Sequence, residues 1–339
     1  MRIAVYGLGA IGGYIAARLA RAGADVCGVA RNATLEAVRS RGIGLHEQRG
    51  EPASWFPLEV AERLVDLAPV DCVILAVKSP AVAAVAADVA SGLQPTGRVV
   101  SAMNGVPWWF VDQMPGPLQG LALDAVDPGN RVLEVLPASR VIGAAIHLSA
   151  FTAAPGEIVR TGGNRIVVGE AGHHPTFTSA GAVGSVLGDA GFEVEVSADI
   201  RRDIWFKLCG NVALNPVSML TRMPSDRLLA DPFVRAFLAT CVSEANDVGN
   251  AIGVGFSESA DERLDGTARL GSFRPSMLQD AEAGRPVEID AVLAAVREIG
   301  EAAGVPTPGL DALLGLCRLH IEAAGLGAGG RPVPLGPQR

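Results

Sequence analysis

The sequence predicts an α/β protein in which an N-terminal Rossmann-like, doubly wound sheet is followed by an all-helical C-terminal domain. Three observations support this fold class. A GxGxxG turn follows a buried strand near the N-terminus, strand-like and helical runs alternate up to about residue 197, and beyond Ala198 almost only helical periodicity remains. The chain has 339 residues, which suits two domains. We expect a nucleotide-binding domain over 1–198, a helical substrate and catalytic domain over 199–325, and a flexible tail over 326–339.

The elements of the first domain follow from the spacing of its apolar residues. A buried strand begins at residue 3, a helix carries Ile11, Ile15 and Leu19 at helical spacing, and a second strand covers 26–30. Further strand-like runs cover 71–77, 97–104 and 140–148, and a helical pattern covers 80–91. This alternation predicts a mostly parallel sheet. At 156–170 two short extended runs flank a Gly-Gly pair at 162–163 and predict a hairpin.

The second domain shows helical patterns and hardly any strand signal. The expected helices cover 203–221, 231–252, 258–270, 276–284, 288–303 and 309–324. The segment 326–339 is rich in Gly and Pro, which is typical of a loose tail.

Composition narrows the class of ligand. Apolar residues make up 49% of the chain and charged residues 19%, and the formal net charge is −8. A nucleic-acid surface needs clustered excess Lys and Arg, so this charge favours a small-molecule ligand. The five cysteines are far apart and contain no CxxC pair, which predicts neither a metal site nor a disulfide framework. Charged residues interrupt every long apolar run, so we expect no membrane partner. The scattered cysteines fit a reducing compartment, so we expect a cytoplasmic protein. We expect either a monomer or a homodimer.

The GxGxxG turn predicts a dinucleotide site. In such a site the first glycine permits a tight turn, the second admits the pyrophosphate and the third lets the helix pack on the strand. The amino terminus of the helix then faces the phosphate charge. A purely structural glycine turn is the alternative, but the position between a strand and a helix favours the nucleotide. The predicted cofactor-binding residues here are Gly7, Gly9, Ala10, Ile11 and Gly12.

Two basic residues bear on which nucleotide is bound. An NAD enzyme usually has an acidic residue at the end of the second strand for the ribose 2′-hydroxyl. Here that position reads VARN, and Arg31 is where a guanidinium pairs with a 2′-phosphate, so we predict NADP(H). Lys78 directly follows an apolar strand and emerges at the carboxyl edge of the sheet, where ligands bind. For both residues an ordinary solvated cation is the alternative.

A nicotinamide enzyme also needs a group that handles the substrate proton. Neither Tyr6 nor Tyr14 has Lys four residues later, and the histidines are scattered. By contrast, Lys207, Asn211 and Asn215 follow one another at a spacing of four, which places an ammonium and two amides along one side of a helix. We predict that this stripe donates a proton to a carbonyl oxygen and holds a carboxylate or hydroxyl. A lone lysine on a helix is more often a solvated charge.

A second group lies in the run at 274–293. Ser276 is placed to cap one helix, and Glu288 follows Pro286 at the start of another. From the residues alone, Glu288 is a carboxylate that complements a helix dipole.

The chain resembles the ketopantoate reductase (2-dehydropantoate 2-reductase) family over essentially its whole length. The resemblance rests on GLGAIG at 7–12, Lys78, NG at 104–105, KLxxNxxxNP at 207–216 and SMLQDxxxGRxxEID at 276–290. It implies a Rossmann domain followed by a helical domain. It also implies NADPH-dependent reduction of ketopantoate to pantoate, a step towards pantothenate and coenzyme A.

The same resemblance implies roles for individual residues. Lys207 matches the catalytic lysine, and Glu288 matches a glutamate near the reacting carbonyl. Asn104 matches the asparagine beside the nicotinamide. The positions that match the 2′-phosphate side of the cofactor are Arg31 and Lys78, and those that match the holders of substrate carboxylate and hydroxyl groups are Asn211, Asn215 and Ser276.

Departures from the family pattern keep the substrate open. Phe273 stands where members that reduce ketopantoate typically have Asn, and the segment 107–137 is longer than in smaller members. Within that segment Trp108 and Trp109 either reshape the pocket or simply pack the loop. A different, larger 2-oxo acid is therefore an alternative substrate. A regulatory protein that binds NADPH without turnover is a second alternative. A third, a relative of the β-hydroxyacid dehydrogenases, is disfavoured by the SMLQD and EID motifs.

Overall fold

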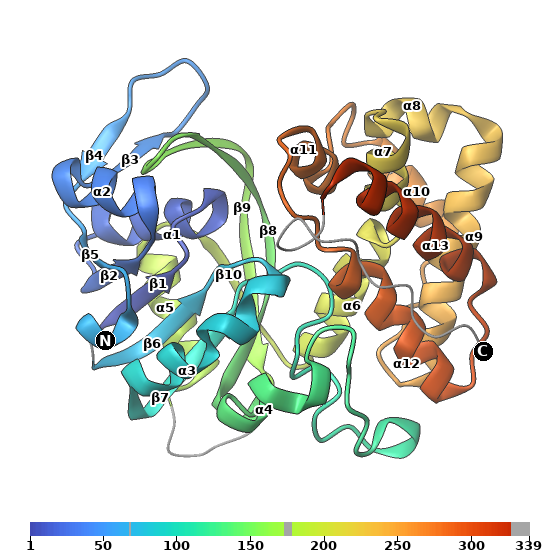
Figure 1. The fold of residues 1–339 in the computed structure, drawn as a ribbon, viewed down its shortest axis with the longest axis horizontal. Helices are drawn as coiled ribbons and strands as arrows, with labels where there is room; N and C mark the ends of the chain where they lie inside the picture. The colour runs from blue at the N-terminus through green and yellow to red at the C-terminus, as the bar shows by residue number, and fades with distance from the viewer. Residues whose placement is uncertain (68, 173–177, 327–339) are drawn as a thin grey trace. The chain divides into compact units, whose positions relative to one another are not determined.

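The computed structural model describes residues 1–67, 69–172 and 178–326, and it divides into two compact units. The first unit comprises Met1–Gln113 and Asn130–Asp203, and the second comprises Met114–Gly129 and Ile204–Arg339. The predicted fold class is confirmed, because a parallel-rich sheet in the first unit precedes a region made of helices (Figure 1). The observed division assigns Met114–Gly129 to the second unit, whereas we expected it in the first. The predicted tail 326–339 lies outside the described residues, apart from Leu326.

The described residues of the first unit form one ten-stranded sheet. Its strand order is β4-β3-β9-β8-β7-β6-β1-β2-β5, with β10 paired to β9. Neighbours run parallel except in the β3–β4 and β8–β9 pairs. The strands are β1 (Ile3–Tyr6), β2 (Val26–Val29), β3 (Ile43–His46), β4 (Ser54–Phe56), β5 (Glu59–Ala61), β6 (Val70–Leu75), β7 (Leu93–Ser101), β8 (Val141–Ala154), β9 (Glu157–Glu170) and β10 (Glu193–Ser197). β1 therefore lies between β6 and β2, and these three strands end at the same edge of the sheet.

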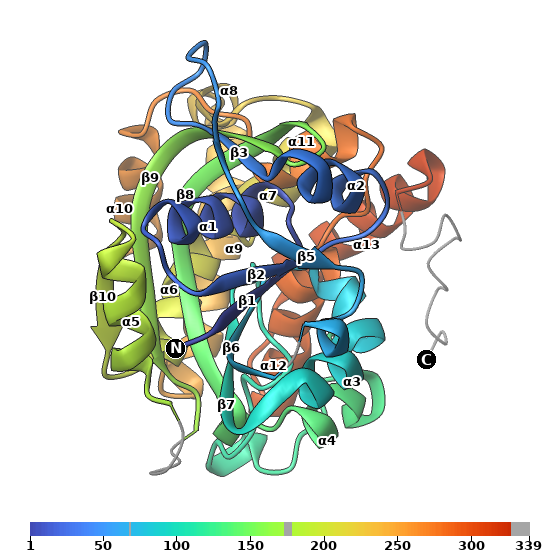
Figure 2. The same ribbon diagram turned by 90° about the vertical axis from the view of Figure 1, so that its left-hand side faces the viewer.

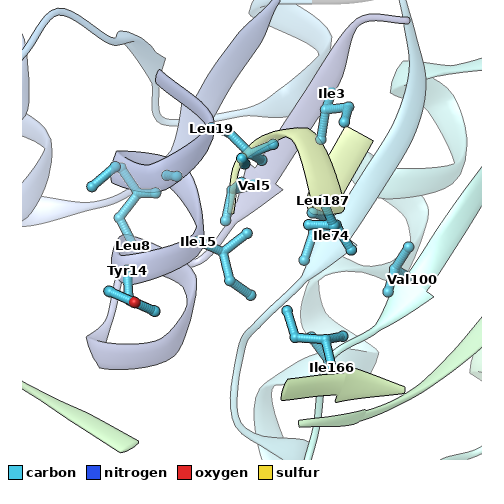
Figure 3. Packing of buried hydrophobic residues seen from close by; sticks show 14 of the residues in the cluster. Ile3, Val5, Leu8, Tyr14, Ile15, Leu19, Ile74, Val100, Ile166 and Leu187 are labelled. Carbon is cyan, nitrogen blue, oxygen red and sulfur yellow. The ribbon is translucent and has the colours of Figure 1, made fainter. Parts of the chain in front are cut away.

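Helices cover both faces of this sheet. They are α1 (Ala10–Arg21), α2 (Asn32–Arg41), α3 (Val82–Gly92), α4 (Arg131–Val135) and α5 (Ala180–Asp189). Figure 3 shows side chains of β1, α1 and α5, among them Val5, Ile15 and Leu187, meeting in one apolar cluster. Side chains alternate along a strand, so Tyr6 points away from this cluster. Its hydroxyl instead reaches Asp88 of α3, which lies on the other face of the sheet (Figure 2).

The hairpin predicted within 156–170 is wrong, because this whole segment belongs to one long strand, β9. The hairpin turn lies earlier, at Pro155 and Gly156, and joins β8 to β9. Gly163 has a φ of 65° at a point where the β8–β9 register shifts. The glycine pair therefore accommodates a β-bulge that bends a continuous strand, and does not form a turn.

The second unit consists of helices and connecting segments. Its helices are α6 (Ile200–Asn211), α7 (Leu214–Thr221), α8 (Ser225–Ala230), α9 (Pro232–Ala251), α10 (Ala260–Ala268), α11 (Ser276–Glu282), α12 (Ala295–Ala303) and α13 (Pro308–Ala324), and a π-helical turn, η6 (Asp290–Ala294), leads into α12. The first residues of α6 belong to the first unit. Trp205 is fully buried and its indole N–H donates to the carbonyl oxygen of Ala245 at 3.1 Å, which joins α6 to α9. Among the described residues no helix has the length and apolarity that crossing a bilayer requires.

The single helix predicted over 203–221 is interrupted. Helix α6 ends at Asn211, and α7 begins at Leu214. Proline has no backbone N–H, so Pro216 cannot continue the α6 hydrogen-bond ladder by donating to the carbonyl of Val212. The interruption turns the chain between Asn211 and Asn215, so these two amides lie on different helices.

The segment Met114–Gly129 is held within the second unit by a carboxylate. Glu298 of α12 accepts hydrogen bonds from the backbone N–H groups of Asp124 and Ala125, both at 2.8 Å. Leu118 and Leu123 of the same segment are buried. These contacts explain why residues that interrupt the first unit in sequence belong to the second in space.

Candidate functional site

The glycine turn after β1 has the geometry that a dinucleotide requires. Gly7 has a φ of 96°, and a β-carbon there would lie 2.9 Å from Val77 Cγ1. A β-carbon on Gly12 would overlap the carbonyl oxygen of Gly7 and come within 2.9 Å of Ala76 Cβ. A β-carbon on Gly9 would meet nothing within 4 Å. The first and third glycines are therefore required by the fold, whereas the second borders open space that a pyrophosphate can occupy.

The amino terminus of α1 faces that open space. Gly9 is its N-cap, and no side chain caps the helix. Gly9 is exposed, and Ala10 and Ile11 at the first two helical positions are partly buried. The first backbone N–H groups of a helix lack intrahelical acceptors and carry a partial positive charge. The turn and helix start therefore fit the diphosphate of a nicotinamide dinucleotide.

The other predicted cofactor residues follow strands that end at the same edge. Arg31 is exposed at the N-cap of α2, two residues after β2. Lys78 and Asn104, both partly buried, come three residues after β6 and β7. Because these strands are parallel to β1, the fold brings all three residues to the carboxyl edge, where open α/β sheets bind ligands.

A hollow of about 610 Å³ lies beside this edge, and sequence reasoning did not find most of its residues. Arg31 lines it together with Tyr6, Glu62, Arg63 and Asp88. The tyrosine hydroxyl donates to Asp88 Oδ2 at 3.0 Å. Burial, and then this carboxylate, raise the pKa of Tyr6 to about 12. A tyrosine as the last residue of an otherwise aliphatic buried strand was the one sequence signal that pointed here.

Lys207 lies on α6 and is partly buried. Burial lowers the pKa of its ammonium from 10.5 to about 8, and the nearby carboxylate of Glu288 acts in the opposite direction. Desolvation penalises the charged form, whereas the carboxylate stabilises it. A lysine with this pKa is mostly protonated at neutral pH and gives up its proton more readily than a solvated lysine.

Glu288 directly precedes the helical segment that contains η6 and α12. Its carbonyl oxygen accepts from the backbone N–H of Val292 at 3.1 Å, so the residue lies at the start of that segment. The position suits a carboxylate that complements the helix dipole, and the electrostatic pairing with Lys207 adds a second role. The second unit therefore brings together the two residues predicted to be catalytic, which are 81 positions apart in the sequence.

The predicted substrate-binding residues occupy three different helices. Asn211 is partly buried at the end of α6, and Asn215 is buried on α7 with 7% exposure. Ser276 is the first residue of α11 and is exposed, and α11 packs against α7. The predicted capping role of Ser276 is wrong, because Pro275 is the N-cap and no side-chain oxygen caps the helix.

The residues that depart from the family pattern have structural roles. Trp108 donates its indole N–H to Leu136 O at 2.9 Å, and Trp109 donates to Ser101 Oγ at 3.0 Å. Both indoles are buried within the first unit, which supports packing over a role in the pocket. The backbone carbonyl of Phe273 accepts from the backbone N–H of Ser225, and the backbone N–H of Phe273 donates to Ser225 Oγ, at 3.0 Å each. These bonds fix the Phe273 backbone ahead of α11.

Comparison with known proteins agrees with this two-part arrangement. A family model described as ketopantoate reductase PanE/ApbA matches residues 3–173, and one for the C-terminal part of the same family matches residues 199–321. The chain belongs to the ketopantoate reductase family. It is 39% identical to a 2-dehydropantoate 2-reductase of Mesorhizobium japonicum over 324 residues, which cover 95% of this chain and 98% of the relative.

Solved structures support the same assignment. A crystal structure from Ralstonia solanacearum MolK2, named as a ketopantoate reductase, shares 46% identity and a TM-score of 0.89 and covers 96% of this chain and 99% of that one. A D-mandelate dehydrogenase in complex with NADH and anilino(oxo)acetate shares the fold, with a TM-score of 0.81 at 19% identity, over 96% of this chain and 100% of that one. The chain is thus an NAD(P)-dependent oxidoreductase of a 2-oxo acid.

Proposed function

We propose that this protein reduces ketopantoate to pantoate with NADPH, in the cytoplasm, as a step towards pantothenate and coenzyme A. The observation that carries the proposal is the pairing of Lys207 with Glu288, together with 39% identity over nearly the full length to a 2-dehydropantoate 2-reductase. The family assignment supports the reaction class. The named substrate and the preference for NADPH are proposals.

The proposed reaction needs a hydride and a proton. A bound reduced nicotinamide supplies the hydride, which is added to the C2 carbonyl carbon of the oxo acid. Lys207 donates a proton from its ammonium to the carbonyl oxygen as negative charge develops there, and it is then reprotonated from solvent. Its pKa of about 8 suits this step, because the group is mostly protonated at neutral pH but holds its proton weakly. The product is the 2-hydroxy acid.

The remaining residues bind and orient in this proposal. Glu288 keeps Lys207 charged or accepts from a substrate hydroxyl. Asn211, Asn215 and Ser276 hold the carboxylate and hydroxyl groups of the substrate through hydrogen bonds. In the first unit, Asn104 lies beside the nicotinamide, and Arg31 and Lys78 bind the 2′-phosphate side of the nucleotide.

A larger 2-oxo acid is the second candidate substrate. Phe273 favours it, because an apolar ring replaces the Asn that ketopantoate-reducing members typically have at this position. A D-mandelate dehydrogenase, which is named for an aromatic acid, has the same fold as this chain.

A substrate panel tests the proposal. Purified protein is mixed with NADPH and ketopantoate, pyruvate, branched 2-oxo acids or phenylglyoxylate, and the loss of absorbance at the nicotinamide band is followed. We expect ketopantoate to give the highest kcat/KM. Turnover only of other oxo acids would overturn the named substrate but keep the reaction class. Tight NADPH binding without turnover of any oxo acid would favour a regulatory protein.

A further inference from the structure

The hollow beside β1 contains two guanidinium groups, of which sequence reasoning assigned only one. Arg31 follows β2 and Arg63 follows β5, and these strands are parallel neighbours. Both residues therefore lie at the carboxyl edge, on the side of β1 where the nucleotide ribose is expected. The side chain of Arg63 is 65% exposed, so it remains accessible to a ligand.

Asp88 lies beneath both guanidinium groups. Its side chain is only 14% exposed, and its Oδ2 accepts from the Tyr6 hydroxyl at 3.0 Å and from the Leu64 backbone N–H at 2.8 Å. Its Oδ1 is buried and has no hydrogen-bond partner among the described residues. The Nε of Arg63 is 3.7 Å from Oδ1, which is an ion pair longer than a hydrogen bond. Arg63 is thus directed by Asp88 but keeps its donors for another anion.

The Tyr6 hydroxyl connects Asp88 to the other guanidinium. Arg31 lies near enough to this hydroxyl for its charge to act against the rise in the pKa of Tyr6, and the hydroxyl in turn donates to Asp88. Asp88, whose side chain is 14% exposed, therefore pairs with Arg63 directly and is connected to Arg31 through the phenol. Guanidinium groups bind phosphate oxygens through two parallel N–H donors, so a pair of oriented guanidinium groups suits a phosphate monoester better than a ribose hydroxyl.

We propose that Arg63 is a further ligand for the ribose 2′-phosphate of NADPH, beside Arg31 and Lys78, and that Tyr6 and Asp88 are positioning residues that hold Arg31 and Arg63 as a two-arginine clamp. This inference rests on the proposed preference for NADPH. It extends that preference to Arg63, Tyr6 and Asp88.

Glu62 lines the same hollow, and its carboxylate carries a charge opposite to that of the two guanidinium groups. A carboxylate accepts from a ribose 2′-hydroxyl and repels a 2′-phosphate. If the Glu62 carboxylate contacts the ribose and the two arginines do not, the hollow binds NADH in preference to NADPH. The clamp and the carboxylate therefore predict opposite nucleotide preferences, which makes the inference testable.

The test measures binding of two nucleotides that lack the nicotinamide. Adenosine 2′,5′-bisphosphate carries the 2′-phosphate, whereas ADP does not, and calorimetry on the full chain gives both dissociation constants. We expect Arg63→Ala to weaken binding of the bisphosphate about tenfold or more without changing ADP binding. Arg39→Ala is the matched control, because it removes an exposed arginine whose one ion-pair partner in the described part of the chain is Glu36 on α2. The effect of Arg63→Ala should shrink as salt is raised.

Tyr6→Phe tests the positioning role while keeping the ring that packs under α3. We expect a higher KM for NADPH, an unchanged KM for NADH and an unchanged kcat. Equal weakening of both nucleotides would indicate a merely structural role and contradict the clamp.

The remaining outcomes are also decisive. Unchanged bisphosphate binding in Arg63→Ala, or equal weakening of ADP and bisphosphate binding in that variant, would overturn the inference. So would tighter NADH than NADPH binding that is weakened by Glu62→Gln. Failure of the proposed function would show differently, as absent turnover of oxo acids, and these binding measurements do not depend on turnover.

Discussion

In the first unit the turn proposed to bind the diphosphate is formed by backbone, whereas in the second unit the groups proposed to react are a few side chains. The glycine turn works because Gly9 leaves space and the start of α1 presents backbone N–H groups. The proposed catalytic part depends on one ammonium that α6 partly buries near one carboxylate. Backbone sites tolerate changes of side chain that do not fill their space. A site made of side chains loses its chemistry when one functional group is removed.

This difference predicts how each unit fails when it is altered. A change in the second unit should abolish chemistry and leave nucleotide binding intact. A change in the glycine turn should weaken nucleotide binding, and it should affect folding only where the β-carbon has no room.

Lys207→Ala should have the largest effect. Loss of a positioned general acid lowers kcat by about 10²- to 10⁴-fold. NADPH binding, measured by fluorescence, should stay within about twofold of the wild type. Lys207→Arg should be almost as inactive, because a guanidinium keeps the charge but does not release a proton. Activity equal to the wild type in either variant would contradict the catalytic assignment.

The glycines of the turn provide a matched pair of substitutions. Gly12→Ala places a β-carbon against the carbonyl oxygen of Gly7, so we expect a loss of about 1–3 kcal/mol in the free energy of unfolding, together with weaker nucleotide binding. Gly9→Ala adds a β-carbon to open space at a φ of −76°, so stability should be unchanged while NADPH binding weakens. Denaturant unfolding and nucleotide titration separate the two effects. Unaltered NADPH affinity in Gly9→Ala would show that the pyrophosphate does not bind at this turn.

Arg31→Ala should affect nucleotide choice and leave the chemistry intact. Removal of a charge-assisted hydrogen bond to phosphate weakens NADPH binding about tenfold or more, and NADH has no group to lose there. The measurement is KM for both nucleotides in the wild type and the variant. Equal use of NADH and NADPH by the wild type would contradict a contact between Arg31 and the 2′-phosphate.

Glu288→Gln should produce the smallest change, a shift of a pH profile. The Glu288 carboxylate raises the pKa of Lys207 from the still lower value that burial alone would give, and the variant loses this contribution. The pH at which reduction begins to fall should therefore move down by about one unit. A profile that stays in place would show that the two groups do not interact during turnover.

The same contrast explains what the sequence predicted. Glycine spacing between a strand and a helix is a local signal, so the turn at Gly7, Gly9 and Gly12 was predictable. The interruption after α6 was overlooked because we gave helical periodicity more weight than Pro216. The bulge at Gly163 was read as a turn because both use glycine with a positive φ.

Contacts between distant residues were beyond the reach of sequence patterns. Tyr6 and Asp88 are 82 positions apart, and no periodicity connects them. The same applies to Glu298 and Asp124, which are 174 positions apart and place Met114–Gly129 in the second unit. The polar stripe on a helix predicted a catalytic role for Lys207, whereas Glu288 was linked to catalysis only through resemblance to a family. Their electrostatic pairing became visible in the structure.

The central claim is that the ammonium of Lys207 supplies the proton in reduction. The most direct test is the pH dependence of kcat/KM in both directions, with ketopantoate and NADPH for reduction and pantoate and NADP⁺ for oxidation. With a pKa of about 8 for Lys207, reduction should fall above that pH, because the protonated acid is lost, and oxidation should rise towards the same pH, because the neutral amine is the base. Profiles that are flat across this range in both directions, or that run in parallel, would contradict the account.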